Sequence, residues 1–168
     1  MITGGPYAGK TTLIEALRER GLAVEEEAAR AYIDEELDKG RTIEGLREDE
    51  AAFQYAILER KLYRHAALPQ GRTTFFDRGI PDTIAYLRAH DVPVSGEVHE
   101  AMGKFTYEKA FVLDLVGHAV DYARTESPEM ATRLNEELLG AYRELGIPVL
   151  RVPVMEPAER VAFVLGNL

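Results

Sequence analysis

The first dozen residues carry the clearest potential for chemistry in this chain. They include the run Gly4-Gly5-Pro6-Tyr7-Ala8-Gly9-Lys10-Thr11-Thr12, which fits the pattern G-x-x-x-x-G-K-[ST] of phosphate-binding P-loops (Walker A). Gly4 and Gly9 permit backbone conformations that a side chain would block, so the loop can wrap closely around an anion. Its inward-pointing amides then form a nest for phosphate groups. Lys10 adds a positive charge near the terminal phosphates, and the Thr11 hydroxyl is placed to bind Mg²⁺.

The segments on either side of this loop favour the same interpretation. A helix is expected from about Lys10 to Arg20, and its positive N-terminal end would face bound phosphates. The apolar Met1 and Ile2 before the loop, and this amphipathic helix after it, favour a P-loop over a glycine turn that happens to precede a helix. A P-loop normally follows a longer strand, so either the central strand is short or the native N-terminus is longer than this sequence.

Asp77 and Arg78 follow an apolar strand expected at 73–76. P-loop proteins place a second carboxylate that organises Mg²⁺ at such a strand end, and Asp77 fits that role. Asp is also common as a cap at ordinary turns, which is the alternative for this residue. Arg78 could contact a phosphate or the substrate, or it could pair with one of the many acids nearby.

Glu27 ends an acidic run after a short apolar strand expected at 22–24. A carboxylate there could accept a proton from a substrate hydroxyl as the hydroxyl attacks the terminal phosphate. Glu25 and Glu26 compete for this role, because strand alternation sends neighbouring side chains to opposite faces. A solvated acidic corner is the alternative for all three residues.

The segment from about 115 to 127 has the composition of a lid. It contains Asp121-Tyr122-Ala123-Arg124-Thr125-Glu126, and Arg133 follows in the next element. The two arginines could fold over bound phosphates and neutralise charge in the transition state. Alternatively, they are helix-surface charges paired with Glu129 or Glu137. We favour the lid for Arg124 and leave both interpretations open for Arg133.

These residues must be positioned by strands and helices that alternate along the chain. Besides the stub before the P-loop, strands are expected at 22–24, 73–76, 110–113 and 148–152, and helices at 10–20, 28–39, 46–68, 81–89, about 95–105, 127–145 and from 157 onwards. This alternation predicts an α/β fold with a five-stranded, mainly parallel sheet flanked by helices. Ligands of such folds bind at the carboxyl ends of the strands, where the P-loop, Glu27, Asp77 and Asp114 should converge.

Composition limits the class of protein. The chain has 168 residues, 46% hydrophobic and 29% charged, which suits one globular domain over 1–168. Its formal net charge of −9 argues against nucleic acid or an anionic membrane surface as the main partner, although it is compatible with a locally basic pocket. The absence of cysteine excludes disulfides and thiol chemistry. No apolar run approaches a membrane span and no signal peptide is visible, so we expect a cytoplasmic protein.

One motif is misleading. Asp114-Leu115-Val116-Gly117 imitates the D-x-x-G switch of GTPases, but it lies later in the chain than that switch should. No N-K-x-D motif for guanine follows it, so we interpret Asp114 as a strand end. The four histidines show no paired spacing for a metal.

Several stretches of the chain resemble a family of bacterial and eukaryotic P-loop proteins that are labelled AAA-type ATPases. They are 2–6 and 9–14 around the P-loop, Glu27-Ala28-Ala29-Arg30, Phe76-Asp77-Arg78-Gly79, Asp121-Tyr122-Ala123-Arg124, and 142–146, 152–154 and 159–161 near the C-terminus. This resemblance covers nearly the whole chain. The family is itself similar to nucleoside and nucleotide kinases, including the ribosylnicotinamide kinase domain, and a eukaryotic relative is known as a GTP- and phospholipid-binding protein.

The resemblance implies a kinase-type fold with strand order 2-3-1-4-5 and a lid after the fourth strand. It also implies an adenine pocket near 152–157, a segment that includes Pro153. The chain departs from ring-forming AAA machines, because it is too short for their helical second domain and lacks an obvious sensor arginine region. A hexameric motor function is therefore not expected.

Together these observations predict a kinase-like phosphotransferase that binds ATP and Mg²⁺, with GTP as the alternative nucleotide. Glu27 would activate a hydroxyl of a small, nucleoside-like acceptor, while Arg78 and Arg124 would stabilise the group in transfer. Arg30, Phe53 and Gln54 would line the acceptor pocket, although core packing explains Phe53 equally well. The alternative function is a nucleotide-dependent switch or binding module with weak hydrolysis, whose pocket would be too small or too apolar for a polar acceptor.

Overall fold

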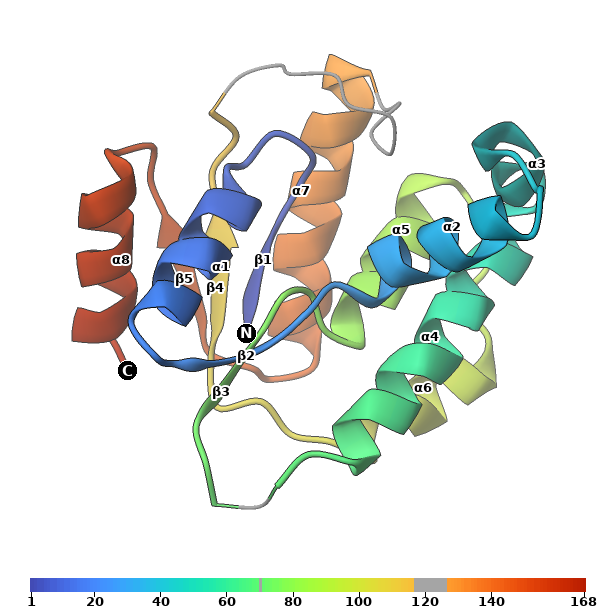
Figure 1. Cartoon of the computed structure of the whole chain (residues 1–168). Coiled ribbons are helices and arrows are strands. Elements are labelled where there is room, and N and C mark those ends of the chain that lie inside the picture. Colours follow the sequence, from blue (N-terminus) through green and yellow to red (C-terminus); the bar gives the residue numbers. More distant parts are fainter. Residues whose placement is uncertain (70, 117–126) are drawn as a thin grey trace.

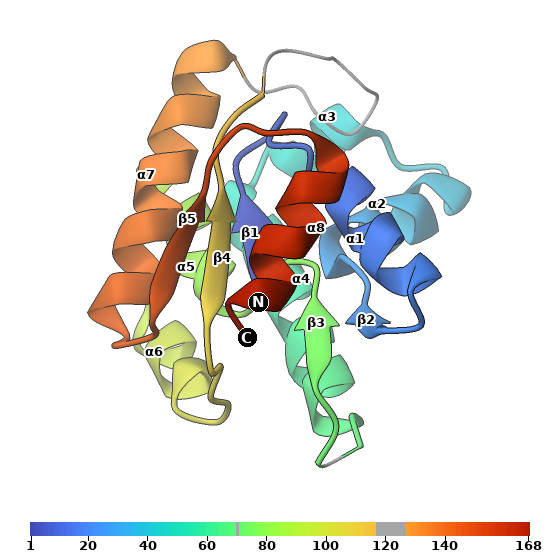
Figure 2. The same ribbon diagram turned by 90° about the vertical axis from the view of Figure 1, so that its left-hand side faces the viewer.

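The computed structural model describes residues 1–69, 71–116 and 127–168, and a small parallel sheet lies at its centre (Figure 1, Figure 2). The strands in these residues are β1 (Ile2–Gly4), β2 (Ala23–Glu25), β3 (Thr74–Phe76), β4 (Ala110–Leu113) and β5 (Val149–Val152). They form two parallel ladders, β2-β3 and β1-β4-β5. One isolated parallel bridge, between Ile2 of β1 and Asp77 after β3, links the two ladders. The predicted α/β class with a parallel sheet is confirmed.

Helices cover both faces of this sheet. In the described part of the chain they are α1 (Lys10–Glu19), α2 (Ala28–Asp38), α3 (Ile43–Arg47), α4 (Glu50–Ala66), α5 (Pro81–Ala89), α6 (Gly96–Met102), α7 (Pro128–Glu144) and α8 (Pro157–Gly166). α1 and α8 pack together on one face, and α7 covers the other, with α5 packed against it (Figure 1, Figure 2). α2, α3 and α4 pack on one another beside α5 and widen the molecule next to the P-loop.

Each face of the sheet has its own hydrophobic core. Leu13 and Leu17 of α1 meet Phe111 on one side, whereas Leu134 and Leu138 of α7 belong to the core on the other side. All four residues of β4 are buried, as expected for a central parallel strand that is covered on both faces. The central strands of the sheet are therefore packed between two hydrophobic cores.

One predicted helix is divided into two in the structure. The sequence predicts a single long helix over 46–68, whereas the structure ends α3 at Arg47 and begins α4 at Glu50. Asp49 is responsible, because its Oδ1 accepts a hydrogen bond from the backbone N–H of Ala52 at 2.9 Å. A capping side chain satisfies a backbone donor at a helix start, so Asp49 creates a new N-terminus inside the predicted helix.

Candidate functional site

The P-loop connects β1 to α1, and its backbone includes residues in the left-handed region. Tyr7 has a φ of 68° and Gly9 a φ of 73°. A Cβ atom on Gly4 would lie 2.9 Å from the Cβ of Ala8, so only glycine fits where the loop leaves β1. Gly9 is the N-cap residue of α1 and offers no side chain to cap it. The N-terminal end of α1, where the helix dipole is positive, therefore borders the loop and favours an anion there.

Two side chains from other parts of the chain hold the P-loop backbone. Asn135 of α7 accepts a hydrogen bond from the N–H of Gly5 at 2.9 Å. Arg160 of α8 donates to the carbonyl of Ala8 and, at 3.3 Å, to the carbonyl of Asp114. Both side chains are buried. Sequence reasoning assigned a role to neither of them.

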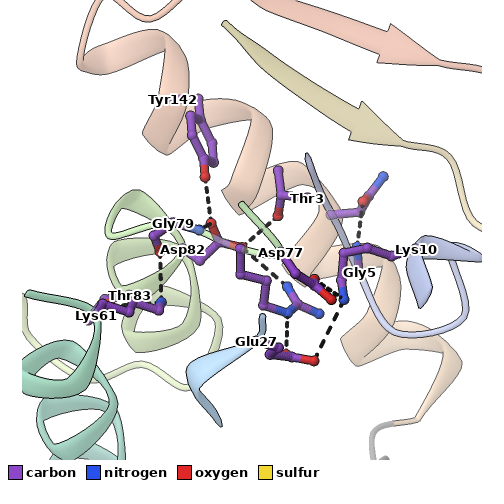
Figure 3. Close-up of polar contacts among 12 residues, drawn as sticks. Thr3, Gly5, Lys10, Glu27, Lys61, Asp77, Gly79, Asp82, Thr83 and Tyr142 are labelled. Atoms are coloured by element: carbon purple, nitrogen blue, oxygen red, sulfur yellow. Dashed lines mark hydrogen bonds and ion pairs between the residues drawn. The ribbon is translucent and has the colours of Figure 1, made fainter. Parts of the chain in front are cut away.

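Lys10 lies buried at the start of α1 between two carboxylates (Figure 3). Its Nζ is 2.7 Å from Oδ1 of Asp77 and 3.7 Å from Oε2 of Glu27. Asp77 directly follows β3, and its N–H donates to the carbonyl of Glu25 in β2 at 2.8 Å. Glu27 is the N-cap residue of α2. The structure therefore brings the P-loop, Asp77 and Glu27 together at the carboxyl ends of the strands.

The two acids that competed with Glu27 have other partners. Glu26 pairs with Arg18 at 3.0 Å on the surface, and Glu25 lies 3.5 Å from Arg64. Of the three acids, Glu27 is the one that contacts Lys10. The end of β2 at Glu25 and the start of α2 after Glu27 thus place Glu27, the last residue of the acidic run, next to Lys10.

Arg78 links Glu27 to the interior of the protein. Its Nε donates to Oε1 of Glu27 at 2.7 Å, and its Nη1 donates to Oδ1 of Asp82 at 3.2 Å. The guanidinium carbon lies 5.1 Å from the centroid of the Tyr86 ring. Arg78 has a φ of 66°, a left-handed conformation that is uncommon outside glycine and that often occurs at functional sites. The side chain is therefore fixed at both ends, next to Lys10.

Burial and charge together set the protonation states in this group. Burial alone would raise the pKa of Glu27, but Lys10 and Arg78 outweigh it and lower the pKa to about 2. Burial raises the pKa of Asp77 despite the attraction of Lys10, and Glu27 adds to the rise. Burial disfavours the charge on Arg78, but Tyr86 and the neighbouring carboxylates raise its pKa overall. At neutral pH the Glu27–Arg78 pair is therefore fully ionised.

A fully buried aspartate anchors Arg78, and sequence reasoning missed it. Asp82, in the first turn of α5, accepts hydrogen bonds from Thr3 Oγ1 at 2.5 Å, Tyr142 OH at 2.6 Å and the N–H of Gly79 at 2.9 Å (Figure 3). Burial raises the pKa of Tyr142, and Asp82 adds to the shift, so the phenol remains a donor. Asp82 thus ties β1, α5 and α7 to the side chain that holds Glu27.

A cavity lies beside the P-loop, and residues of α2, α4 and α5 line it. Its charged lining groups are Lys10, Glu27, Arg30, Arg47, Lys61 and Arg78. Arg30, Phe53 and Gln54, which the sequence suggested for an acceptor pocket, all line this cavity. The ring centroids of Phe53 and Tyr32 are 5.7 Å apart, so Phe53 also takes part in packing. The lining is therefore mixed, with ionic, amide, aromatic and apolar groups.

The remaining sequence-predicted residues fall in three places. Thr11 and Thr12 are exposed in the first turn of α1, and Pro153 is exposed directly after β5. Arg124 lies outside the described residues, as does the greater part of the proposed lid, 117–126. These roles stay predictions.

Arg133 and Asp114 form ion pairs away from Lys10. Nη1 of Arg133 donates to Asp91 at 3.0 Å on the surface, which agrees with the surface-charge alternative, although Asp91 was not among its expected partners. Oδ1 of Asp114 accepts a hydrogen bond from Arg151 at 2.6 Å. This pairing agrees with the interpretation of Asp114 as a strand end.

The part of the chain that the structure describes contains neither a cluster of metal-binding side chains nor a membrane-spanning helix. No three His, Cys, Asp or Glu side chains there are arranged to hold a metal ion by themselves. None of the described helices has both the length and the apolar character needed to cross a bilayer.

A P-loop at the end of β1, in a parallel sheet with helices on both faces, defines this molecule as a P-loop α/β protein. Among known families, the one described as the AAA domain matches residues 1–160. The chain belongs to this AAA-domain family, and the resemblance seen in its sequence is confirmed. No curated protein matches the chain significantly.

Solved structures identify the kind of fold more narrowly. Thymidylate kinase from Ehrlichia chaffeensis matches with a TM-score of 0.71 at 13% identity, covering 99% of this chain and 95% of that one. Deoxyadenosine kinase from M. mycoides, with bound dCTP, matches with a TM-score of 0.65 at 14% identity, covering 99% and 96%. The same kinase with dCMP and dCDP gives a TM-score of 0.65 at 13% identity, covering 99% and 96%. The chain therefore has the fold of nucleoside and nucleotide kinases.

Proposed function

We propose that this protein transfers the terminal phosphoryl group of ATP, bound with Mg²⁺, to a hydroxyl of a small, nucleoside-like acceptor. One observation carries the proposal. Lys10, Glu27 and Arg78 form a continuous chain of contacts, of 3.7 Å and 2.7 Å, within the lining of a single cavity beside the P-loop. A phosphotransferase needs this juxtaposition, because its phosphate-binding groups and its acceptor pocket must share a boundary.

The residues around the P-loop suit a nucleotide and a magnesium ion. The uncapped start of α1 favours phosphate oxygens, and Lys10 would exchange its contact with Asp77 for the β- and γ-phosphates. Thr11 and Asp77 offer oxygen donors, which Mg²⁺ prefers, and the phosphates would complete its coordination. In this proposal the adenine base lies near Pro153, and GTP is the alternative nucleotide.

On the acceptor side of the cavity, Glu27 would bind the attacking hydroxyl and Arg78 would stabilise the group in transfer. Transfer forms a bond from the acceptor oxygen to the γ-phosphorus and breaks the bond to the bridging oxygen, so that ADP leaves. Glu27 would accept the hydrogen bond of the hydroxyl and then its proton. A carboxylate with a pKa of about 2 is a weak base, so its main effect is orientation, which suits a loose transition state. Arg78, with Arg124 from the proposed lid, would neutralise charge on the group in transfer.

The proposal is tested by measuring ATP turnover with and without a panel of nucleosides and ribosides. At least one acceptor should stimulate turnover, and Glu27→Gln should lower the stimulated kcat by about 100-fold. The binding of a fluorescent ATP analogue should be retained in this variant, because the P-loop is unchanged. Glu26→Gln is the matched control, since Glu26 pairs with Arg18 on the surface, and it should behave like the wild type.

The alternative is a nucleotide switch with weak hydrolysis only. If no acceptor stimulates turnover and Glu27→Gln leaves basal hydrolysis intact, the switch replaces the kinase as the better interpretation. The mixed lining of the cavity favours the kinase, because a switch has no need of a pocket that offers Gln54 and several charged groups to a polar molecule.

A further inference from the structure

Lys61 of α4 is a buried cation in the lining of the cavity, and its partners are neutral. The residue is 5% exposed. Its Nζ donates to the carbonyl of Gly79 at 2.7 Å and contacts Oγ1 of Thr83 at 3.4 Å (Figure 3). Among the described residues, no carboxylate forms an ion pair with it. A buried ammonium group that has only neutral partners is costly, because hydrogen bonds to neutral oxygens replace only part of its hydration.

Two other cations of the lining are neutralised by the protein itself. Arg47 pairs with Glu50 at 2.8 Å, and Arg78 pairs with Glu27 at 2.7 Å. Lys61 differs from both, since its hydrogen bonds go to Gly79 and Thr83 and no carboxylate of the described residues forms an ion pair with it. This excess of positive charge occurs inside a protein whose net charge is −9. An anionic ligand is the partner that such a site lacks.

We infer that the Lys61 side of the cavity is a subsite for a phosphomonoester, so that the acceptor is a nucleoside monophosphate or a similar phosphorylated riboside. This inference rests on the proposed function for its assignment of the cavity to the acceptor. Lys61 would donate to the phosphate oxygens, while the attacking hydroxyl lies at Glu27. The subsite would recognise the phosphate group, which a nucleotide and a sugar phosphate have in common.

The charge state of Lys61 agrees with this role. Burial lowers the pKa of Lys61 to about 8, and the nearby Asp82 opposes the shift. The ammonium form therefore still predominates at neutral pH. Arg78 and Glu27 also act on Lys61, with opposite signs. A phosphate dianion next to Nζ would raise this pKa and recover part of the desolvation cost.

The test is isothermal titration calorimetry on the full chain with Mg²⁺ and saturating AMPPNP in the P-loop. AMP, GMP, CMP, UMP and dTMP are titrated beside their five nucleosides, with ribose 5-phosphate and inorganic phosphate as two further probes. At least one monophosphate should bind about tenfold more tightly than its nucleoside. Lys61→Met should remove this preference, and Lys61→Arg should restore most of it. Lys104→Met, which changes an exposed lysine after α6, is the matched control and should keep it.

Every result of these titrations either supports the phosphate subsite at Lys61 or overturns it. Ribose 5-phosphate or inorganic phosphate that binds with the same dependence on Lys61 supports the subsite and identifies the part of the ligand that it reads. Equal affinity for monophosphates and nucleosides, no binding of any phosphomonoester, or a preference that survives in Lys61→Met would overturn it. A purely structural role lowers the melting temperature of Lys61→Met without changing the affinity ratio, and this result also counts against the subsite.

The failure of the proposed function is a separate result. If AMPPNP binds and no acceptor is phosphorylated, while the Lys61-dependent preference persists, the phosphotransfer is wrong and the anion subsite stands. If transfer occurs to unphosphorylated nucleosides with equal efficiency, the phosphotransfer stands and the subsite is wrong.

Discussion

At the scale of single residues, Arg160 shows how a side chain far along the chain shapes the P-loop. It is buried on α8 and donates to the carbonyl of Ala8 inside the loop and to that of Asp114 after β4. A Cβ atom on Gly9 would lie 3.1 Å from Nη1 of Arg160, so the guanidinium also packs closely against the loop. Arg160 therefore holds the backbone of the loop, and in the proposed function this conformation presents the loop amides to phosphate.

We predict that Arg160→Leu weakens the binding of a fluorescent ATP analogue by roughly tenfold, because hydrogen bonds from a charged donor to the loop carbonyls are lost. Equilibrium titration measures the effect, and thermal unfolding checks that the variant is folded. Arg151→Leu is the control, since Arg151 is exposed and pairs with Asp114 at the surface. An unchanged dissociation constant for Arg160→Leu would show that the loop keeps its conformation without the hydrogen bonds of Arg160.

The site residues that could be suggested from the sequence differ from those that could not in how far along the chain their partners lie. The P-loop is a local pattern, and Asp77, Arg78 and Glu27 could be proposed as site residues because each follows a recognisable strand. Arg160 contacts a residue 152 positions away, and Asp82 contacts Thr3 at a separation of 79. No local pattern encodes such distant partners. The one available signal for Asp82 was an acid next to the apolar residues at the start of a helix.

At the scale of elements, a buried polar network supports a very short central strand. β1 has three residues and is joined to β3 by a single bridge, so its backbone pairing on that side is sparse. Thr3 compensates by donating to Asp82, which also binds Tyr142 of α7. The network replaces ladder hydrogen bonds with side-chain hydrogen bonds in a low-dielectric interior, where they are strong if every partner is satisfied.

We predict that Asp82→Asn lowers the free energy of unfolding by about 3 kcal/mol or more, because it removes a buried charge from Arg78 and an acceptor from the network. Tyr142→Phe removes one hydrogen bond and should cost about 1 kcal/mol. Urea unfolding measures both values. Asp91→Asn, at an exposed ion pair with Arg133, is the control and should cost less than about 1 kcal/mol. Equal effects at the two aspartates would refute a structural role for the network.

At this scale the sequence predicted the alternation of strands and helices well, since hydrophobic runs and capping signals are local. It missed the break between α3 and α4, where the cap at Asp49 interrupts an otherwise continuous helical pattern. It also missed the buried role of Lys61, because a lysine at a helical position is normally a solvated charge. Only the packing of α4 against the start of α5 turns that lysine into a lining group of the cavity.

At the scale of the whole molecule, the net charge and the charge of the cavity are opposite. The chain carries −9, whereas cations outnumber carboxylates in the lining of the cavity. An acidic surface disfavours adventitious polyanions such as nucleic acid, while the cation-rich interior admits a small anion whose shape fits. The proposed selectivity for small phosphorylated molecules is thus a property of the charge distribution as well as of single residues.

Acid stability is a second property of the whole fold, and His65 sets part of it. His65 is 7% exposed and stacks on Phe76 with ring centroids 4.4 Å apart. The hydroxyl of Tyr107 accepts from the N–H of Ile80 at 3.1 Å and is placed to donate to Nε2 of His65 at 2.8 Å. Burial lowers the pKa of His65 to about 4, and a neutral imidazole is also the form that can accept this hydrogen bond.

We predict that His65 makes the protein less stable as the pH falls from 7 to 5. The pKa of His65 is about 4 in the folded state and about 6.5 in the unfolded state, so the unfolded chain takes up the proton first. The stabilisation is complete above pH 6.5 and is lost as the pH falls towards 4, with up to about 2 kcal/mol gone by pH 5. Urea unfolding of wild type and His65→Phe at both pH values should show a smaller loss in the variant. His99→Phe, at an exposed histidine, should keep the wild-type loss, and an identical slope in His65→Phe would mean that another group titrates in this window.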